Sequence, residues 1–284
     1  MGKFSFFVVL AATLLAAVWL GRSLYLEEEH VDIIGGTPGE RFYGVDDDED
    51  KKKESKVIKF DLLDPESAPE TMLTKILYGY HLMLETKQNA PEYAGNTITC
   101  NNCHFNGGNT LGGKNRGISL VGVTAVYPQF SKRDGKQISI RDRIANCFQR
   151  SLNGSTPSKD SLQMESLVAY LAWISHEVAD APMLPWLGLD ELTSKHTPDE
   201  KNGKKIYYAS CALCHGYQGE GTTGVPPLWG SDSFNDGAGM NTMKMLSSFV
   251  WLNMPYGQPV LTQEEALDVA AFIISRPRPH FNKK

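Results

Sequence analysis

The sequence predicts an all-α protein made of two similar helical domains in tandem, behind an N-terminal membrane-anchor helix. Three observations lead to this prediction. The motif C-x-x-C-H occurs twice, at residues 100–104 and 211–215. Each copy is followed by glycine-rich turns and then by an amphipathic helical pattern. The chain also opens with an uncharged apolar run, and its 284 residues are enough for two domains.

The apolar run covers residues 4–20, with Lys3 before it and Arg22 after it. Its 17 residues are at the lower limit of a helical membrane span and within reach of a long signal-peptide core. No clear A-x-A cleavage site follows, so an uncleaved anchor over residues 1–25 is preferred to a cleaved signal. Lys3 would stay in the cytoplasm. Both interpretations place the body of the protein on the periplasmic side of the bacterial cytoplasmic membrane.

A charged tether is expected over residues 26–60, because residues 46–53 carry five acidic and then three basic side chains without an apolar one. The formal net charge of the chain is -5. This mild acidity excludes a strongly basic nucleic-acid-binding protein, so no nucleic acid is expected as a partner.

The first domain is expected over residues 61–181. A helix at about 69–86 precedes the first C-x-x-C-H motif, and glycine-rich turns at 107–113 follow it. The domain closes with apolar residues at i, i+3, i+4 and i+7, which lie on one face of a helix. These residues are Leu167, Tyr170, Leu171 and Ile174.

A proline-rich linker is expected over residues 182–198, followed by the second domain over residues 199–284. Residues 201–211 are predicted to be helical up to the second motif. The closing pattern then repeats, and Thr262 with Glu265 forms a capping box ahead of it. The repeated apolar positions are Leu267, Ala270, Ala271 and Ile274.

Two C-x-x-C-H motifs predict two covalently bound haem c groups, each held by two thioethers and one axial histidine. The cysteines are Cys100, Cys103, Cys211 and Cys214, and the axial histidines are His104 and His215. A structural zinc site is the alternative. It is disfavoured because 107 residues separate the two cysteine pairs, against roughly 15–20 in the usual four-cysteine arrangement.

Each half resembles the small all-helical cytochrome c fold. Gly203 and Tyr207, ahead of Cys211, resemble the residues that the first helix of this fold packs against its last helix. The resemblance implies two tandem cytochrome c-like domains.

The sixth ligand decides whether such a haem binds small ligands or transfers electrons. In the second half Met254, in Asn253-Met254-Pro255, lies 39 residues after His215 and resembles the methionine-ligand loop of cytochrome c. The competing methionines fall where a core helix is expected. They are Met240, Met243 and Met245.

The first half has no matching Met-Pro pair, since Met164 lies in the closing helix and Met183 in the linker. It has instead the fifth cysteine, Cys147, 43 residues after His104. A leftover thiol is a buried bystander, an intermolecular disulfide partner or a reactive or ligating group. His176 is the other candidate ligand. A thiolate ligand would lower the haem potential and supply a sulfur nucleophile.

The surroundings of Cys147 are basic. Residues 131–151 contain six basic and two acidic side chains, which gives a local charge of +4 in an acidic protein. Guanidinium groups suit tetrahedral oxyanions because their paired N–H donors meet paired oxygens. The alternative is that these arginines bind haem propionates or face water.

Around Cys147 the chain resembles the dihaem thiosulfate dehydrogenases, which form tetrathionate. The resemblance covers residues 65–277 and is most specific in the cysteine-centred segment. The matching segments are residues 143–154 (RIANCFQRSLNG), 93–96 (YAGN) and 127–130 (YPQF).

The resemblance implies that His104 and Cys147 ligate the catalytic haem and that His215 and Met254 ligate the electron-transfer haem. It implies that Arg133, Arg143 and Ser151 hold substrate. The implied partners are thiosulfate, tetrathionate and an external cytochrome or other redox protein. Some family members have a lysine directly before the methionine, where this chain has Asn253. The direct pair His215/Met254 is therefore expected, without exchange of ligands.

Two rival functions remain open at this point. One is a non-enzymatic dihaem electron-transfer cytochrome of a periplasmic respiratory chain, which has no need of Cys147 or its arginines. The other resembles the sulfur-oxidising cytochromes that couple thiosulfate to a separate carrier protein. The physiological direction of the reaction is also open, because tetrathionate reduction would use the same site.

Overall fold

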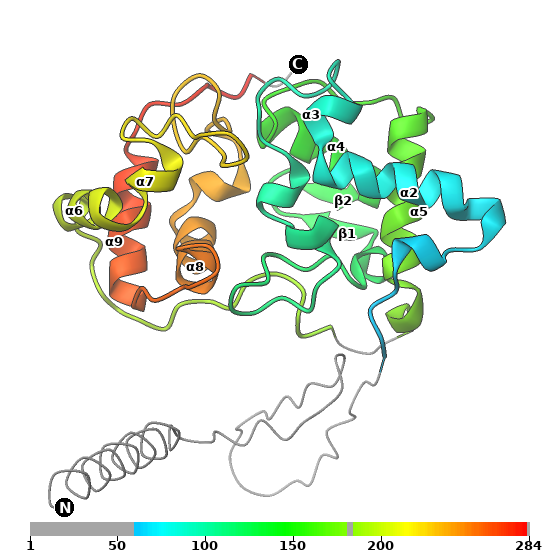
Figure 1. The fold of residues 1–284 in the computed structure, drawn as a ribbon, viewed down its shortest axis with the longest axis horizontal. Helices are drawn as coiled ribbons and strands as arrows, with labels where there is room; N and C mark the ends of the chain where they lie inside the picture. Colours follow the sequence, from blue (N-terminus) through cyan, green and yellow to red (C-terminus); the bar gives the residue numbers. More distant parts are fainter. Residues whose placement is uncertain (1–59, 181–183, 283–284) are drawn as a thin grey trace, which may run out of the picture. The chain divides into compact units, whose positions relative to one another are not determined.

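The computed structural model describes residues 60–180 and 184–282 (Figure 1). The expected anchor at 1–25 and the expected tether, apart from Phe60, lie outside the described residues. Every helix within the described ranges is too short or too polar to cross a membrane. The two haem-motif halves lie in one compact unit of the chain.

The first half is built on a crossing of two helices, α2 (Glu70–Leu84) and α5 (Leu162–Ile174). Gly79 of α2 lies so close to α5 that a Cβ at this position would be 2.1 Å from the backbone oxygen of Ser166. The apolar positions expected in α5 are buried. The hydroxyl group of Tyr170, one of them, donates a hydrogen bond to the carbonyl of Gly107, which follows the first motif. The crossing thus places the first C-x-x-C-H motif.

The shorter elements of the first half precede α2, lie between the two helices or follow α5. They are η1 (Pro65–Ser67), α3 (Thr86–Asn89), η2 (Cys100–Asn102), η3 (Phe105–Gly108), η4 (Val123–Val126), β1 (Gln129–Ser131), β2 (Lys136–Ile138), α4 (Ile140–Arg150) and η5 (His176–Val178).

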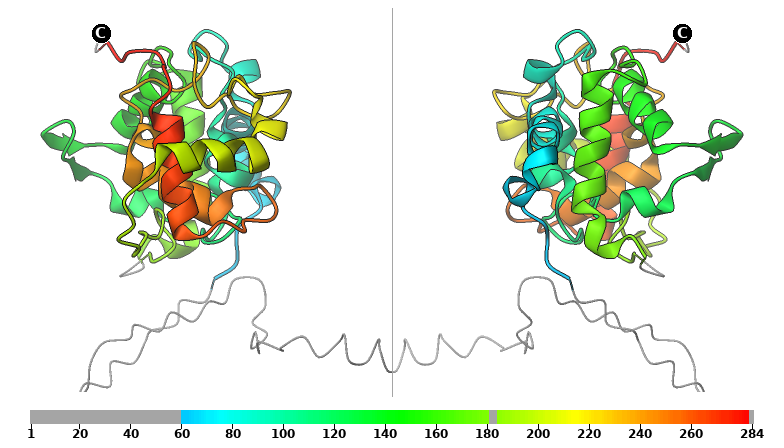
Figure 2. Two further views of the ribbon diagram at one scale, coloured as in Figure 1. Left: turned by 90° about the vertical axis from the view of Figure 1, so that its left-hand side faces the viewer. Right: turned by 90° about the vertical axis from the view of Figure 1, so that its right-hand side faces the viewer.

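A small antiparallel hairpin corrects the all-α prediction. Strands β1 and β2 pair Gln129 with Ile138 and Ser131 with Lys136, and the hairpin projects from the helices of the first half (Figure 2). Gly135 has a φ of 67° in the connecting turn. The Asp134-Gly135 pair is a turn signal that sequence analysis could have used. The hairpin runs directly into α4, the helix that carries Cys147.

The second half repeats the helix crossing with α6 (Glu200–Ser210) and α9 (Gln263–Ile274), which cross in the left view of Figure 2. A Cβ on Gly203 would be 1.9 Å from the backbone oxygen of Asp268. Tyr207 is fully buried, with its ring centroid 5.4 Å from that of Phe272. The predicted packing of Gly203 and Tyr207 against the last helix is confirmed. The remaining elements are α7 (Ala212–His215), η6 (Gly239–Asn241) and α8 (Met243–Asn253).

The last helix begins as the sequence predicts. The side chain of Thr262 accepts a hydrogen bond from the backbone N–H of Glu265, and the Glu265 carboxylate accepts one from the N–H of Thr262. These two bonds form the expected capping box, which satisfies N–H groups that have no partner within the helix.

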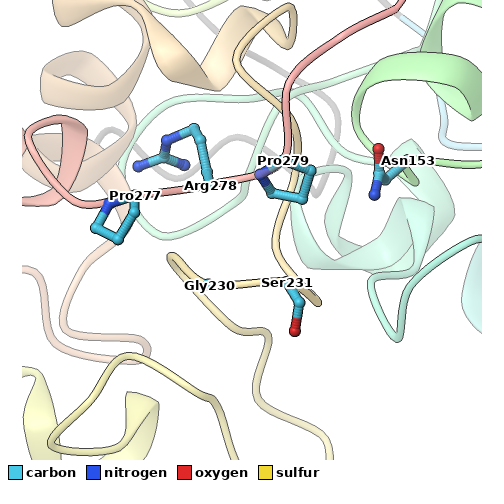
Figure 3. Close-up of a pocket in the computed structure, with 6 residues that line it drawn as sticks. All are labelled: Asn153, Gly230, Ser231, Pro277, Arg278 and Pro279. Carbon is cyan, nitrogen blue, oxygen red and sulfur yellow. The ribbon is translucent and has the colours of Figure 1, made fainter.

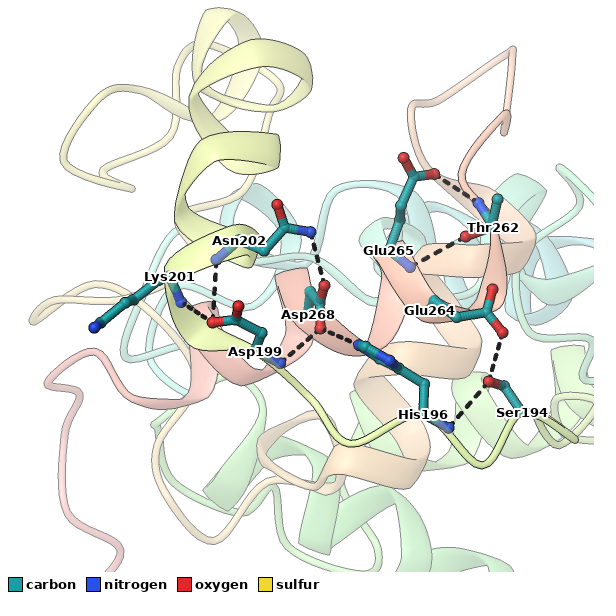
Figure 4. Close-up of polar contacts among 9 residues, drawn as sticks. All are labelled: Ser194, His196, Asp199, Lys201, Asn202, Thr262, Glu264, Glu265 and Asp268. Atoms are coloured by element: carbon teal, nitrogen blue, oxygen red, sulfur yellow. Dashed lines mark hydrogen bonds and ion pairs between the residues drawn. The ribbon is translucent and has the colours of Figure 1, made fainter.

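The segment between the halves contacts both of them. Trp186 is buried in the core of the first half and donates from its indole nitrogen to the carbonyl of Val121 at 2.8 Å. Farther along, the ring nitrogen Nε2 of His196 lies 2.7 Å from Oδ1 of Asp268 on α9 (Figure 4). Asp268 is 3% exposed and also accepts hydrogen bonds from the N–H of Asp199 and from Nδ2 of Asn202. These contacts fasten the start of α6 to α9.

Backbone and amide hydrogen bonds join the two halves. The amide of Asn96 donates to the carbonyl of Ser233, and the amide of Asn235 donates to the carbonyl of Gln149. Phe234 and Ala238, which follow the second motif, pack into the core of the first half. The described halves therefore share an interface as well as a linking segment.

Candidate functional site

The two C-x-x-C-H histidines have the same hydrogen-bonding arrangement. Nδ1 of His104 lies 2.9 Å from the backbone oxygen of Ile118, and Nδ1 of His215 lies 2.9 Å from the backbone oxygen of Pro226. A carbonyl that accepts from Nδ1–H fixes the imidazole orientation and leaves Nε2 to ligate a metal. Both histidines are therefore prepared for an axial position on iron.

Burial keeps these imidazoles neutral. It lowers the pKa of His104 to about 4, against the opposing effect of the Ile118 carbonyl, and the positive charge of Arg143 lowers it slightly further. Burial also lowers the pKa of His215. A neutral imidazole is the form that binds iron.

The motif cysteines are free thiols rather than disulfides. Burial raises the pKa of Cys100 to about 11 and that of Cys103 to about 12, and a charge on Cys147 adds to both effects. Free cysteines beside a prepared histidine fit the covalent attachment of haem in both halves. The same electrostatic coupling shows that the fold brings Cys147 close to the first motif.

Cys147 lies on α4, which starts at a well-formed N-cap. The hydroxyl of Ser139 accepts from the backbone N–H of Asp142, and the Asp142 carboxylate accepts from the N–H of Ser139. One turn before the thiol, Nη1 of Arg143 donates a hydrogen bond to Sγ of Cys147 at 3.0 Å. A thiolate at Cys147 raises the pKa of Arg143. Nη1 of Arg143 is thus a cationic hydrogen-bond donor in direct contact with the Cys147 sulfur.

Ser151 and Arg133, the other two residues expected to hold substrate, lie on different elements of the first half. Ser151 caps the end of α4, and its N–H donates to the carbonyl of Cys147 at 2.9 Å. Arg133 is exposed in the turn of the β1–β2 hairpin. Its charge acts on Asp134 and on Arg150 at the end of α4. Arg143 and Ser151 therefore lie one turn before and one turn after Cys147, whereas Arg133 lies on the hairpin and interacts with Asp134 and Arg150.

Met254 directly follows α8, and its N–H donates to the carbonyl of Val250. The side chain is partly buried against the core of the second half. Met243 and Met245 lie within α8, and Met243 packs against the core of the second half. Met240 packs against the first half instead. Met254 is thus the methionine at the end of this helix.

Asn253 ties the Met254 segment to the first half. It is fully buried, and its Oδ1 accepts a hydrogen bond from the N–H of Gly117 at 2.8 Å. The neighbouring N–H of Asn115 donates to the carbonyl of Leu252 at 2.7 Å. Gly117 directly precedes Ile118, the hydrogen-bond partner of His104. One short segment therefore contacts the surroundings of both His104 and Met254.

The positions of the alternative sixth ligands in the first half do not favour them as haem ligands. Met164 is fully buried in α5, as expected for a packing residue, and His176 is exposed in η5. Met183 lies outside the described residues.

Comparisons with known proteins show the family of the chain. Residues 90–179 match the family described as SoxA/TsdA, cytochrome c domain, and residues 198–273 match the family described as Cytochrome C oxidase, cbb3-type, subunit III. The chain is 36% identical over 215 residues to the thiosulfate dehydrogenase of Allochromatium vinosum, an alignment that covers 73% of this chain and 80% of that protein. This chain belongs to the thiosulfate dehydrogenase family. It is accordingly an oxidoreductase with two cytochrome c domains.

Other members of the thiosulfate dehydrogenase family show similar agreement. The Thiomonas intermedia protein is 36% identical over 224 residues, which cover 76% of this chain and 70% of that one. A solved structure, the as-isolated form of thiosulfate dehydrogenase (TsdBA) from Marichromatium purpuratum, matches with a TM-score of 0.70 and 29% identity. The match covers 78% of this chain and 50% of that chain, so this chain spans half the length of that structure.

Sequence reasoning missed several groups that complete the site of this thiosulfate dehydrogenase family member. The carbonyls of Ile118 and Pro226 orient the two histidines, but no residue-type pattern marks a backbone acceptor. Asn253 was noticed as a departure from the lysine of some members, and its buried contact with Gly117 is a finding of the structure. The sequence marks Arg150 only as one of the six basic residues between positions 131 and 151.

Proposed function

We propose that this chain oxidises two thiosulfate ions to one tetrathionate ion at a first haem ligated by His104 and Cys147. Electrons leave through a second haem ligated by His215 and Met254. The observation that carries the proposal is the hydrogen bond from Arg143 to Sγ of Cys147, on a helix that lies beside the first C-x-x-C-H motif. A cytochrome that only carries electrons has no need of a cysteine sulfur that is hydrogen-bonded to an arginine.

The residue types suit this reaction. Two thiosulfate dianions lose two electrons and form one sulfur–sulfur bond, so the total charge falls from four negative to two negative. Bringing two dianions to 4 Å costs about 4 kcal/mol even in bulk water, and more in a partly buried site. Arg143 and Arg133 supply positive charge that offsets this repulsion. Ser151 adds a hydroxyl beside them that can donate to a sulfonate oxygen.

When bound, each haem would accept one electron. The protein side chains bind the substrate and offset its charge. The Arg143 guanidinium orients the Cys147 sulfur, which either bonds transiently to a sulfane sulfur or makes way for the substrate. The short segment from Gly117 to Ile118 joins the surroundings of His104 to the Asn253-Met254 segment. The same short segment therefore borders both proposed haem sites.

The sequence and the family also support a proposal for the cellular setting. Covalent haem and thiosulfate chemistry suit a location outside the cytoplasmic membrane, and we propose that the apolar run at residues 4–20 anchors the protein there. The electron acceptor would be an external cytochrome or another redox protein. The same residues would serve tetrathionate reduction, so the direction depends on the potentials of the haems and of the partner.

The test is thiosulfate-dependent reduction of an artificial electron acceptor by the purified holoprotein, beside Cys147→Gly and the control Ala145→Gly. The control has the same glycine cost on the same helix, about 1 kcal/mol, without loss of the thiol. We expect activity in the parent and in the control, and a loss of at least about 100-fold in Cys147→Gly. Full turnover by Cys147→Gly would eliminate the thiolate role. No turnover by the parent in either direction, with both haems redox-active, would favour the electron-carrier alternative.

A further inference from the structure

A second arginine lies on the same face of α4 as Cys147. Arg143, Cys147 and Arg150 are spaced i, i+4 and i+7, which places them along one side of a helix. Arg150 is only 9% exposed, although a guanidinium is seldom buried without a partner. It was not among the residues that the family resemblance assigned to substrate.

The second half of the chain holds this guanidinium in place. The ring of Phe281 lies under Cζ of Arg150 at 4.0 Å, and Nη1 of Arg150 donates to the carbonyl of Gly237 at 3.2 Å. Phe281 is fixed in turn because its N–H donates to Oδ1 of Asp236 at 2.7 Å. The preceding tail residues Pro277, Arg278 and Pro279 line one pocket together with Asn153 of the first half (Figure 3). These contacts keep the Arg150 guanidinium buried and away from solvent.

The hydrogen bonds of Arg150 are incomplete. Its Nε is buried and has no hydrogen-bond partner in the described structure. Burial lowers the pKa of Arg150, and the charges of Arg133 and Arg143 lower it further against the opposing effect of Asp134. Asp134 is itself engaged by the Ser131 hydroxyl and the Asn146 amide. A buried N–H donor among three guanidinium groups and one carboxylate is unfavourable unless an anion accepts from it.

We propose that Arg150 is a third cationic binding residue of the site around Cys147 and that it holds one oxyanion group there. The oxyanion is either a sulfonate of bound thiosulfate or tetrathionate, or a propionate carboxylate of the first haem. If the anion is a sulfonate, the inference rests on the proposed function. The two sulfonate ends of tetrathionate need two cationic positions, on opposite sides of the new sulfur–sulfur bond. The propionate source needs only the first haem.

The experiment compares Arg150→Gln with Arg141→Gln in the haem-loaded protein. Arg141 is on the same helix and donates to the carbonyl of Lys159, so it controls for loss of one charge. Two quantities are measured. One is the dissociation constant of thiosulfate for the fully reduced protein, by calorimetry, where no oxidation can occur. The other is the reduction potential of each haem, by spectroelectrochemistry.

A rise of roughly 10- to 100-fold in the thiosulfate dissociation constant, with both potentials unchanged, identifies the sulfonate as the anion. A lower potential of the first haem alone, with thiosulfate binding unchanged, identifies the propionate, because loss of a nearby cation favours the ferric form. Unchanged binding and unchanged potentials in a folded Arg150→Gln protein would overturn the proposal. If that variant does not fold, Arg150→Lys keeps the charge but loses the forked donors. A higher thiosulfate dissociation constant in Arg150→Lys would then identify the sulfonate, and an unchanged one would overturn the sulfonate source.

If the parent protein neither binds nor oxidises thiosulfate, the proposed function fails while the potential of the first haem still tests Arg150. An unchanged potential in Arg150→Gln would then overturn this inference too.

Discussion

Nη1 of Arg143 and Sγ of Cys147 are 3.0 Å apart, one turn from each other on α4. The contact needs no long-range folding once the helix has formed, because residues i and i+4 are neighbours on its surface. What the fold adds is the position of this pair next to Cys100, Cys103 and His104. The pair turns an ordinary leftover cysteine into a candidate catalytic group.

Loss of the Arg143 guanidinium should reduce activity without loss of haem. A hydrogen bond to a charged group is worth about 1.5–3 kcal/mol, so Arg143→Ala should lower kcat/KM for thiosulfate roughly 10- to 100-fold. Arg143→Lys should lie between the variant and the parent, because it keeps the charge but not the fork. Steady-state kinetics on Arg141→Ala is the control and should stay within about twofold. Equal activities of Arg143→Ala and Arg141→Ala would contradict this role.

Replacement of Met254 should change the second haem alone. Methionine ligation raises haem potential, so Met254→Ala should lower the potential of one haem and remove the sulfur-to-iron charge-transfer absorption of its ferric form. Visible spectroscopy and a redox titration measure both effects. Met245→Leu, within α8, should leave spectrum and potential as in the parent. If Met245→Leu rather than Met254→Ala removed the absorption, the ligand assignment would be wrong.

The buried carboxylate of Asp268 should make stability depend on pH. Three donors, from Asn202, Asp199 and His196, outweigh the effect of burial and lower the pKa of Asp268. A lowered folded-state pKa means that its stabilisation is present above the unfolded value of about 3.9 and is lost as pH falls through the folded value. Asp268→Asn should therefore cost about 1–3 kcal/mol at pH 7, measured by urea unfolding, and progressively less below about pH 4.

The control for this change is Asp232→Asn, an exposed aspartate in the same half. Its free energy of unfolding should follow that of the parent within about 0.5 kcal/mol at both pH values. A deficit in Asp268→Asn that stayed the same at pH 3 as at pH 7 would argue against the carboxylate's charge as its source.

The two helix crossings should be equally intolerant of a methyl group. Gly79→Ala and Gly203→Ala each place a Cβ about 2 Å from a backbone oxygen of the facing helix. Overpacking of this kind costs about 1–3 kcal/mol or more, so the thermal unfolding temperature should fall by several degrees in both variants. Gly239→Ala has no atom within 4 Å of its new Cβ and should be near neutral. A neutral Gly79→Ala or Gly203→Ala would show that these helices can separate at little cost.

Local features of this chain were predictable from sequence because they depend on residues close together in the chain. The helix ahead of the first motif was expected at 69–86 and is α2 (Glu70–Leu84), and the Thr262 and Glu265 capping box starts α9 as predicted. Apolar spacing identified the buried face of α5. The hairpin before α4 was missed, although its Asp134-Gly135 turn signal is equally local.

The sequence alone determined the two C-x-x-C-H motifs and the odd cysteine in a basic segment, and its resemblance to the cytochrome c fold predicted the packing of Gly203 and Tyr207 against the last helix. Tertiary structure alone decided which backbone carbonyls orient His104 and His215, and that Asn253 meets Gly117 across the two halves. It also decided that Phe281 supports Arg150. The physical reason is that every residue has the same carbonyl and almost every residue the same N–H. Which of them meets a given side chain depends on how distant segments pack, and residue type does not encode that packing.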